Sequence, residues 1–320
     1  MKTVFLDQGS VQPSDLDWSK LNDNIGGQLV SYDHTPTELM IERAQGAEVL
    51  ITNKVILGAD EFKCLPELKL ICVAATGVNN IDLVAAKAAG IVVTNVPAYS
   101  TESVVLYTLS LMLSLCSASG RYHKKVVAGA WSSSLHFCLS DFCFSELAHK
   151  TLVIFGYGDI GRRVAEVTRA LLMNVVIAER PGQPVRQGRV CFEEALKLAD
   201  VFSLHCPLTA ETKNLITAKE FASMKASSYL INVARGGIVN EVDLAQALID
   251  KKIAGAALDV LSIEPPPEHH PLVLAAQQLD NLIITPHVAW ASVDARQRLI
   301  DEIALNIDAF SQGQSRNVVA

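Results

Sequence analysis

Residues 151–171 read TLVIFGYGDIGRRVAEVTRAL, so three glycines stand between an apolar, β-branched run and a helical pattern. In the spacing GxGxxG the first glycine permits a tight turn, the second lets the backbone approach a pyrophosphate, and the third allows close helix–strand contact. The N-terminus of the following helix offers backbone N–H groups to an anion. The stretch therefore predicts a dinucleotide-binding turn, whose cofactor-binding residues are Gly156, Gly158, Asp159, Ile160 and Gly161.

The same alternation of strand and helix continues after this turn. Further apolar runs occur at NVVIA, DVFSLHC, SYLINVA, AGAALDV and NLIITPH, with helices expected to begin near residues 160, 192, 218 and 242. Strands that alternate with helices form a parallel sheet joined by crossover connections. We therefore predict a doubly wound Rossmann dinucleotide-binding domain over residues 98–288.

The first hundred residues repeat the pattern on a smaller scale. Strands are predicted at 3–6, 48–52, 68–75 and 91–97, and helices near 37–45 and 81–90. A long apolar helix from about Thr101 to Ala130 leaves this region, and an amphipathic helix from about Ser292 to Phe310 is expected to pack back on it. The fold class is thus α/β, with two doubly wound parallel-sheet domains. The smaller, flavodoxin-like domain is discontinuous and comprises residues 1–97 and 289–320.

Composition restricts the class of protein. The chain has 320 residues, of which 50% are hydrophobic and 19% charged, which suits two packed cores. A net charge of −7 without a basic run argues against a nucleic-acid partner. The N-terminus does not resemble a signal peptide, and the uncharged stretch 104–120 is interpreted as a buried helix rather than a membrane span. We therefore expect a soluble, cytoplasmic protein without a membrane partner.

The cysteines give no sign of a metal site or a disulfide framework. No pair has CxxC spacing, and an odd number suits a reducing compartment. The seven positions are Cys64, Cys72, Cys116, Cys138, Cys143, Cys191 and Cys206.

Glu179 ends the strand that follows the glycine turn, 179 − 161 = 18 residues beyond the last glycine. An acidic side chain there can accept hydrogen bonds from the adenosine ribose hydroxyls, which favours NAD. Arg180 follows directly and could instead contact the 2′-phosphate of NADP. The predicted cofactor is therefore NAD, with NADP left open.

Three segments that follow later strands carry residues suited to acid–base chemistry. They are INVARGG with Arg235, ALDVLSIEPPP with Asp259 and Glu264, and ITPHVAW with His287. Reduction of a keto acid needs a carboxylate anchor, a proton donor, and a group that favours the protonated donor. Arginine, histidine and glutamate can supply these roles. From the residue types alone, a surface arginine and a capped histidine explain the pattern equally well.

Seven ordered segments resemble the D-isomer-specific 2-hydroxyacid dehydrogenases over essentially the whole chain. They are AATGVNNID (74–82), NVPAYSTESV (95–104), ELAHKTLVIFGYGDIG (146–161), HCPLTAET (205–212), INVARGG (231–237), AALDVLSIEP (256–265) and TPHVAWAS (285–292). The resemblance implies that Arg235 binds substrate, that Glu264 pairs with His287, and that His287 is the acid–base residue. Asp259 would hold the nicotinamide carboxamide.

The resemblance also assigns further binding residues. Those implied for the cofactor are Cys206, Pro207, Thr212 and Ala234, and those implied for the substrate are Lys54, Thr76, Gly77, Val78 and Trp290. The backbone at 76–78 would hold the substrate carboxylate. Since these substrate residues belong to the smaller domain, neither domain alone is expected to hold a complete site.

Within the family, TNK at 52–54, EPPPEHHPL at 264–272 and Trp290 resemble the branch that reduces hydroxypyruvate or glyoxylate to D-glycerate or glycolate. D-lactate, phosphoglycerate or a bulkier 2-keto acid stay open as substrates. A non-catalytic, NAD-sensing binding protein is a further alternative, although it would have no need of a proton donor. The family also implies a two-fold interface on the helix at 101–130, hence a homodimer.

Overall fold

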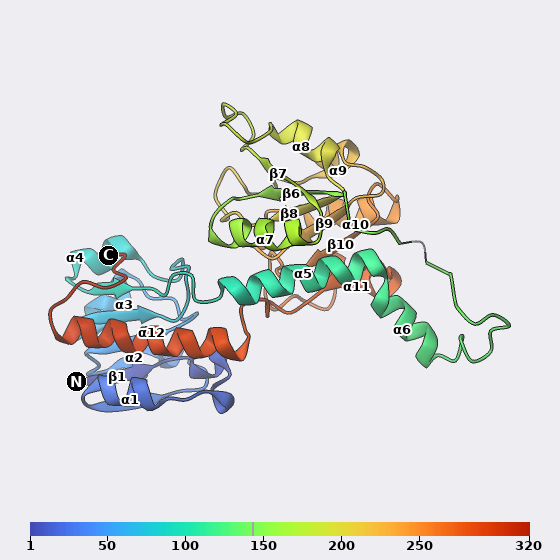
Figure 1. Cartoon of the computed structure of the whole chain (residues 1–320). Coiled ribbons are helices and arrows are strands. Elements are labelled where there is room, and N and C mark those ends of the chain that lie inside the picture. The colour runs from blue at the N-terminus through green and yellow to red at the C-terminus, as the bar shows by residue number, and fades with distance from the viewer. Residues whose placement is uncertain (143) are drawn as a thin grey trace. The chain divides into compact units, whose positions relative to one another are not determined.

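The computed structural model describes residues 1–142 and 144–320, so that Cys143 lies outside the described residues. The chain forms two compact units, one of Met1–Ser100 with Trp290–Ala320 and one of Thr101–Ala289 (Figure 1). Each unit is a part of the chain whose residues contact one another more than they contact the other part. The assignment of domains with boundaries after residues 97 and 288 stays a prediction.

The first unit is built on a five-stranded parallel sheet with the order β2-β1-β3-β4-β5. Its strands are β1 (Lys2–Phe5), β2 (Gln28–Ser31), β3 (Val49–Thr52), β4 (Leu70–Val73) and β5 (Val92–Thr94). This is the flavodoxin-like doubly wound order. β3 and β4 are buried along their whole length, as expected for central strands covered on both faces. The predicted fold of this region is confirmed.

Helices cover both faces of this sheet. One core lies under α1 (Ser19–Ile25) and α12 (Val293–Ser311), which lie side by side in Figure 1. The other lies under α2 (Met40–Ala44), α3 (Ala59–Cys64) and α4 (Leu83–Ala88). Short 3₁₀ turns occur at η1 (Gln8–Val11), η2 (Pro13–Asp15) and η3 (Thr37–Leu39). The C-terminal helix thus completes the core of the N-terminal sheet.

The second unit contains a six-stranded parallel sheet with the order β11-β10-β9-β8-β6-β7. Its strands are β6 (Thr151–Phe155), β7 (Asn174–Ala178), β8 (Val201–Leu204), β9 (Tyr229–Asn232), β10 (Gly255–Leu258) and β11 (Leu282–Ile284). All six predicted strands are present. An isolated parallel bridge between Ala178 and Val190 extends the sheet beyond β7. With this extension, the spatial order of the strands is the one expected of a Rossmann sheet.

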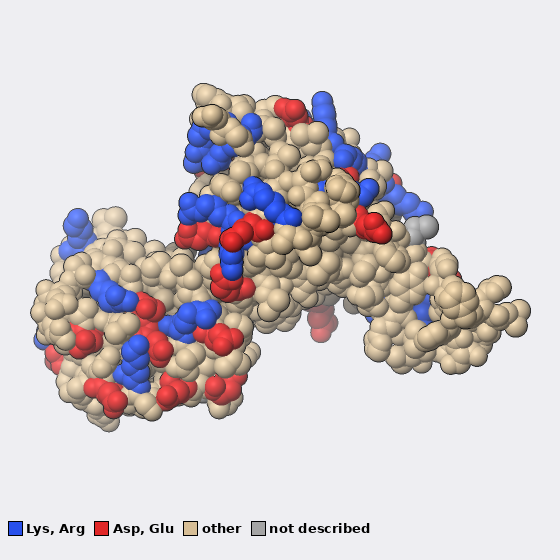
Figure 2. All heavy atoms as spheres, viewed as in Figure 1, with Lys and Arg blue, Asp and Glu red and all other residues tan. Residues whose placement is uncertain are grey.

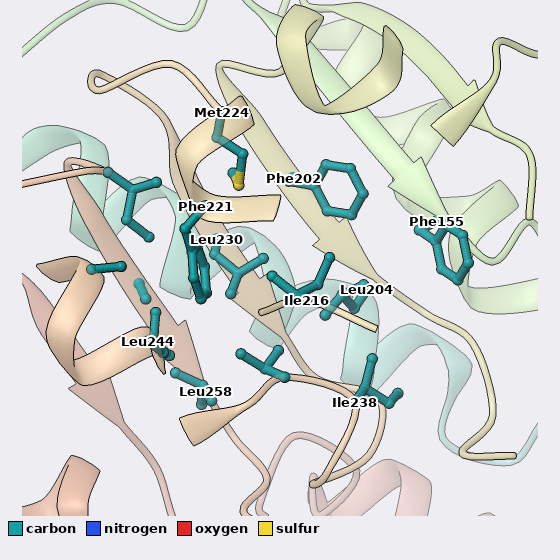
Figure 3. Packing of buried hydrophobic residues seen from close by; sticks show 14 of the residues in the cluster. Phe155, Phe202, Leu204, Ile216, Phe221, Met224, Leu230, Ile238, Leu244 and Leu258 are labelled. Carbon is teal, nitrogen blue, oxygen red and sulfur yellow. The ribbon is translucent and has the colours of Figure 1, made fainter. Parts of the chain in front are cut away.

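One large core fills the face of this sheet under α8 (Phe192–Leu198), α9 (Ala218–Ser223), α10 (Glu241–Ile249) and α11 (Pro271–Gln278). Figure 3 shows side chains of this core that come from strands, such as Phe155, Phe202 and Leu204, and from helices, such as Phe221 and Leu244. α5 (Thr101–Ser117) and α7 (Asp159–Ala170) contact strands of the same sheet and each other. α6 (Ser119–Val127) follows α5 along the chain.

The prediction of one continuous helix from Thr101 to Ala130 is wrong. The chain turns at Ala118, whose φ of 53° lies in the left-handed region, and α5 and α6 are bent by 62° relative to each other. The apolar pattern ends at this point, where serines and Gly120 lower the helix propensity before the polar α6. Among the described residues no single helix is long and apolar enough to cross a bilayer. α5 and α6 meet that criterion only when joined.

Candidate active site

The three glycines of the turn at 156–161 differ in what they contact. A Cβ on Gly156, whose φ is +99°, would lie 2.5 Å from the His205 carbonyl carbon. A Cβ on Gly161 would lie 2.2 Å from the Gly156 oxygen. A Cβ on Gly158 would meet no atom of the described chain within 4 Å. Packing therefore requires the first and third glycines, whereas Gly158 leaves open space beside the start of α7.

The first turn of α7 borders that open space. Asp159 begins this 12-residue helix, Ile160 follows, and the Asp159 carboxylate pairs with Arg162 at 2.6 Å. Backbone N–H groups in the first turn of a helix have no intrahelical partner, and the helix dipole favours an anion beside them. The turn therefore fits the pyrophosphate of a dinucleotide.

Glu179 directly follows β7 and is almost completely buried, with 1% of its surface exposed. Its carboxylate accepts hydrogen bonds from the Arg186 guanidinium at 2.5 and 2.6 Å and from the Arg180 backbone N–H at 2.9 Å. The Arg186 hydrogen bonds lower the pKa of Glu179 to about 2. The side chain of Arg180 is exposed. The strand end thus presents an ionised carboxylate with arginines around it.

The segments after β8 and β9 carry the other residues predicted to bind cofactor. Burial raises the pKa of the Cys206 thiol to about 12, so it is protonated at neutral pH. The Thr212 hydroxyl donates to the Pro207 carbonyl at 2.7 Å, which closes the loop at 207–212. The Ala234 N–H donates to the Asn232 side chain at 3.1 Å. These contacts fix the loops, and contact with a cofactor stays a prediction for all four residues.

Asp259 organises the segment that carries the predicted catalytic histidine. One carboxylate oxygen accepts from the Thr285 hydroxyl at 2.6 Å and the Val288 N–H at 3.0 Å, and the other accepts from the Ala289 N–H at 2.8 Å. Burial raises the pKa of Asp259, while these hydrogen bonds oppose the increase. Three of the roughly four acceptor positions of the carboxylate are occupied within the protein. Its predicted contact with the nicotinamide carboxamide stays a prediction.

His287 lies in the left-handed region with a φ of 55°, which is uncommon for a residue other than glycine. Its N–H donates to the carbonyl groups of Asp259 and Thr285 at 2.8 and 3.0 Å. Its ring atom Nδ1 lies 2.6 Å from Glu264 Oε2, and the two side chains are 30% and 35% exposed. The structure therefore brings together the histidine and the glutamate that the sequence suggested as a pair.

Arg235 lies in the turn after β9 and is exposed. Its guanidinium donates to the Ala234 carbonyl at 2.7 Å. The next residue, Gly236, packs directly against the turn of Glu264, since a Cβ there would lie 1.8 Å from the Leu261 oxygen. The backbone segments of Arg235 and Glu264 are therefore in contact.

Apart from Arg235, the residues predicted to bind substrate lie in the first unit and are described within it. The Thr76 hydroxyl donates to the Val96 carbonyl at 2.9 Å, and the Thr76 carbonyl accepts from Asn95 at 2.7 Å. Gly77 and Val78 continue this turn after β4 and are partly exposed. The turn is therefore held from one side while its 76–78 backbone remains accessible.

Lys54 and Trp290 have different surroundings. The Lys54 N–H donates to the buried Asp7 carboxylate at 2.6 Å, and its side chain is exposed. The Trp290 ring packs against the core under α12 and meets the Tyr99 ring edge-on, with centroids 6.3 Å apart. Packing thus accounts for part of the Trp290 surface, and a contact of either residue with substrate stays a prediction.

Comparison with known proteins identifies the family. Residues 109–289 match the model of the D-isomer specific 2-hydroxyacid dehydrogenase, NAD binding domain. The chain belongs to the D-isomer-specific 2-hydroxyacid dehydrogenase family. It is 43% identical to a glycerate dehydrogenase of Methylorubrum extorquens, in an alignment that covers 99% of this chain and 98% of that protein. It is 36% identical to a hydroxypyruvate reductase of Blautia hydrogenotrophica over 100% and 99% of the two chains.

The fold is similar to that of a solved structure over the full length of both chains. The TT0316 protein of Thermus thermophilus superposes with a TM-score of 0.88 at 31% identity, covering 100% of both chains. As a D-isomer-specific 2-hydroxyacid dehydrogenase, the protein is an oxidoreductase of 2-hydroxy acids that uses a nicotinamide dinucleotide. The fit of the 156–161 turn to a dinucleotide is consistent with this assignment.

Three residues beside the site were not found from the sequence. Arg186 lies in a loop without periodicity, so nothing marked it as the partner of Glu179. Glu241 and His270 pair at 3.0 Å next to the Glu264 turn. The available signal for His270 was its position before Pro271, because proline is common in the first turn of a helix and the preceding residue often caps it.

Proposed function

We propose that this dehydrogenase reduces hydroxypyruvate or glyoxylate to D-glycerate or glycolate with NADH and catalyses the reverse reactions. The observation that carries the proposal is the 2.6 Å pair of His287 and Glu264, with the histidine ring partly exposed. The substrate class draws support from the glycerate dehydrogenase and hydroxypyruvate reductase among the relatives. A binding protein that only senses NAD would have no need of such a pair.

The proton step is assigned to His287. Because Nδ1 donates to the Glu264 carboxylate, the other ring nitrogen, Nε2, is the atom that gives its proton to the substrate carbonyl oxygen. The Glu264 carboxylate accepts the hydrogen bond from Nδ1 and thereby fixes the orientation of the ring. When bound, the nicotinamide supplies the hydride for reduction or accepts it in the reverse direction.

In the second unit, binding of the substrate is assigned to Arg235. The guanidinium offers a planar pair of donors for a carboxylate or a developing oxyanion. In the first unit, the family resemblance assigns a part in binding to the backbone at 76–78. Lys54 supplies a further positive charge, and Trp290 limits the size of the group on the terminal carbon. This limit favours small 2-keto acids over 2-keto acids with bulkier side chains.

The preference for NAD over NADP is assigned to Glu179. Its pKa of about 2 keeps it ionised at every physiological pH, so it accepts hydrogen bonds from ribose hydroxyls and repels a 2′-phosphate. Arg180, Arg186 and Arg189 surround the same strand end, and Arg186 and Arg189 pair with the carboxylate. The choice of cofactor therefore depends on the Glu179 charge outweighing theirs.

We further propose a cytoplasmic homodimer. α6 and the segment after it reach out from the rest of their unit in Figure 1, and the face of this projection shown in Figure 2 carries few charges. Its exposed apolar side chains are Val126, Val127, Trp131, Leu135, Phe137 and Phe144. Apolar patches of this kind are typical of subunit interfaces. The six described cysteines form no disulfide with one another, which suits a reducing compartment.

The decisive experiment combines a substrate panel with a His287→Ala variant. Hydroxypyruvate, glyoxylate, pyruvate and 3-phosphohydroxypyruvate are compared by kcat/KM with NADH and NADPH. Loss of the proton donor should lower kcat about 10²- to 10⁴-fold, while the Kd for NADH stays within a few-fold of wild type. A variant that retains its turnover would refute the acid–base assignment. A higher kcat/KM for 3-phosphohydroxypyruvate would refute the substrate assignment alone.

A further inference from the structure

The Glu241 carboxylate connects the start of α10 to the turn that carries Glu264. Glu241 Oε1 accepts the Ser262 N–H at 2.6 Å, and Oε2 accepts the Ser262 hydroxyl at 2.5 Å. The two residues are 21 positions apart in the chain. With only 9% of its side chain exposed, the carboxylate needs such partners to offset its desolvation. Ser262 is therefore held through both its backbone and its side chain.

His270 also binds this carboxylate, at the oxygen Oε2 that accepts the Ser262 hydroxyl. Its Nδ1 accepts the Leu272 N–H at 3.3 Å and thereby caps α11, which leaves the proton on Nε2. Nε2 lies 3.0 Å from Glu241 Oε2, and the histidine is 4% exposed. The position of Glu241 is thus fixed by α10 and α11 together.

This anchored turn also carries the predicted catalytic pair. Within it, Glu264 Oε1 accepts the Leu261 N–H at 2.8 Å, so the carboxylate moves with the turn. His287 has a separate anchor, because its backbone donates to Asp259 and Thr285. A displacement of the 261–264 turn would therefore lengthen the contact between Glu264 and His287.

The segment of Arg235 is joined to the same turn at two points. Gly236 packs against Leu261, with space too small for a Cβ, and five residues later Glu241 bonds to Ser262. Both ends of the short segment between Arg235 and α10 are thus attached to the Glu264 turn.

We infer that Glu241, held by His270, is a positioning residue that sets the distance of Glu264 from His287 and the placement of the Arg235 turn beside them. This inference rests on the proposed roles of His287 and Glu264. It adds a buried carboxylate on α10 and its histidine partner at the start of α11, which touch neither substrate nor cofactor and act through Ser262.

The test uses full-length Glu241→Gln and Ser262→Ala, with Glu220→Gln as the matched control. Glu220 is a largely buried carboxylate of the same unit that accepts the N–H and the hydroxyl of a single residue, Thr217, at 3.1 and 2.6 Å. Ser262→Ala leaves the Glu241 charge in place. An effect in that variant therefore cannot come from lost charge.

Loss of positioning should lower kcat/KM about 10- to 100-fold in Glu241→Gln, with a smaller decrease in Ser262→Ala. Both variants should move the high-pH loss of reductase activity to lower pH, since a more distant Glu264 favours the protonated imidazole less. Asp259 also faces His287, and neither variant alters it. Glu220→Gln should lower the Tm without moving the pH profile. If Glu241→Gln and Glu220→Gln behave alike, the inference is overturned.

A second measurement separates this inference from the proposed function. The ring proton on His287 Nδ1, assigned by its absence in His287→Gln, is followed by NMR in the resting enzyme. Its exchange with water should be at least several-fold faster in Glu241→Gln than in wild type, whereas Glu220→Gln should not change it. If His287→Ala retains turnover while this difference appears, the function fails and the positioning stands. Unchanged exchange in Glu241→Gln would reject the positioning itself. If Glu241→Gln does not fold, the same comparison is made with Ser262→Ala, in which unchanged exchange has the same meaning.

Discussion

Gly158→Ala should separate cofactor binding from folding, because the added methyl group meets no atom of the described chain within 4 Å. The backbone at this residue, with φ −86° and ψ −157°, is also open to alanine. Replacing glycine where alanine fits restricts the unfolded chain and stabilises the fold by about 0.4–1 kcal/mol. We therefore expect the Tm of Gly158→Ala to equal or slightly exceed that of wild type.

The affinity for NADH should fall in Gly158→Ala, although the stability of the fold does not. The methyl group would occupy the space beside the first turn of α7, where backbone N–H groups would hold the pyrophosphate. Loss of one hydrogen bond to a charged group is worth about 1.5–3 kcal/mol. Since 1.4 kcal/mol corresponds to a tenfold change in Kd, the Kd for NADH should rise about 10- to 100-fold.

The assay pairs calorimetric titration of NADH with thermal unfolding in the absence of cofactor, and Gly161→Ala is the control. A Cβ on Gly161 would lie 2.2 Å from the Gly156 oxygen and 3.1 Å from Ile154 Cγ2, so that variant should lose stability. Wild-type affinity for NADH in Gly158→Ala would refute the assignment of this turn to the dinucleotide.

Three further outcomes are expected. Burial lowers the pKa of His205 from 6.5 to about 4, so the unfolded chain binds a proton that the folded protein excludes. The free energy of unfolding should therefore fall by about 1.4 kcal/mol per pH unit from pH 6.5 towards 4, and denaturant titrations of His205→Gln should lack this slope. Glu179→Gln should reduce the preference for NADH over NADPH about 10-fold when both enzymes are compared at one pH, and an unchanged ratio in the variant would count against Glu179. Light scattering should report twice the 34.6 kDa of one chain, and a monomer mass would exclude the dimer.

The sequence predicted those parts of the fold in which local pattern and burial agree. Every strand of the second sheet was found, because a parallel strand covered on both faces is a continuous apolar run. β2 (Gln28–Ser31) was missed, since it is an edge strand whose two ends are exposed. The turn at Ala118 was also missed, because composition shows where apolar periodicity ends but not the backbone angle adopted there.

Some residues of the candidate site could likewise be predicted from local sequence, and others could not. The glycine turn and Glu179 follow from local spacing, since each is fixed by one strand and the turn after it. Glu264 and His287 are 23 positions apart, so their pairing came from the family resemblance rather than from periodicity. The partner of Glu179, Arg186, depends on the path of an irregular loop, which no pattern encodes.

The order of the strands explains why these distant residues meet. Arg235 follows β9, Glu264 follows β10 and His287 follows β11, and these are three neighbouring parallel strands. The carboxyl ends of such strands lie at one edge of the sheet. Asp259, at the end of β10, then binds the backbone after β11, so the middle strand carries both the anchor of His287 and, through the following turn, its carboxylate partner. The geometry of the acid–base pair is therefore set mainly by β10, and residues that hold the turn after β10 should influence it more than equally distant residues elsewhere in the unit.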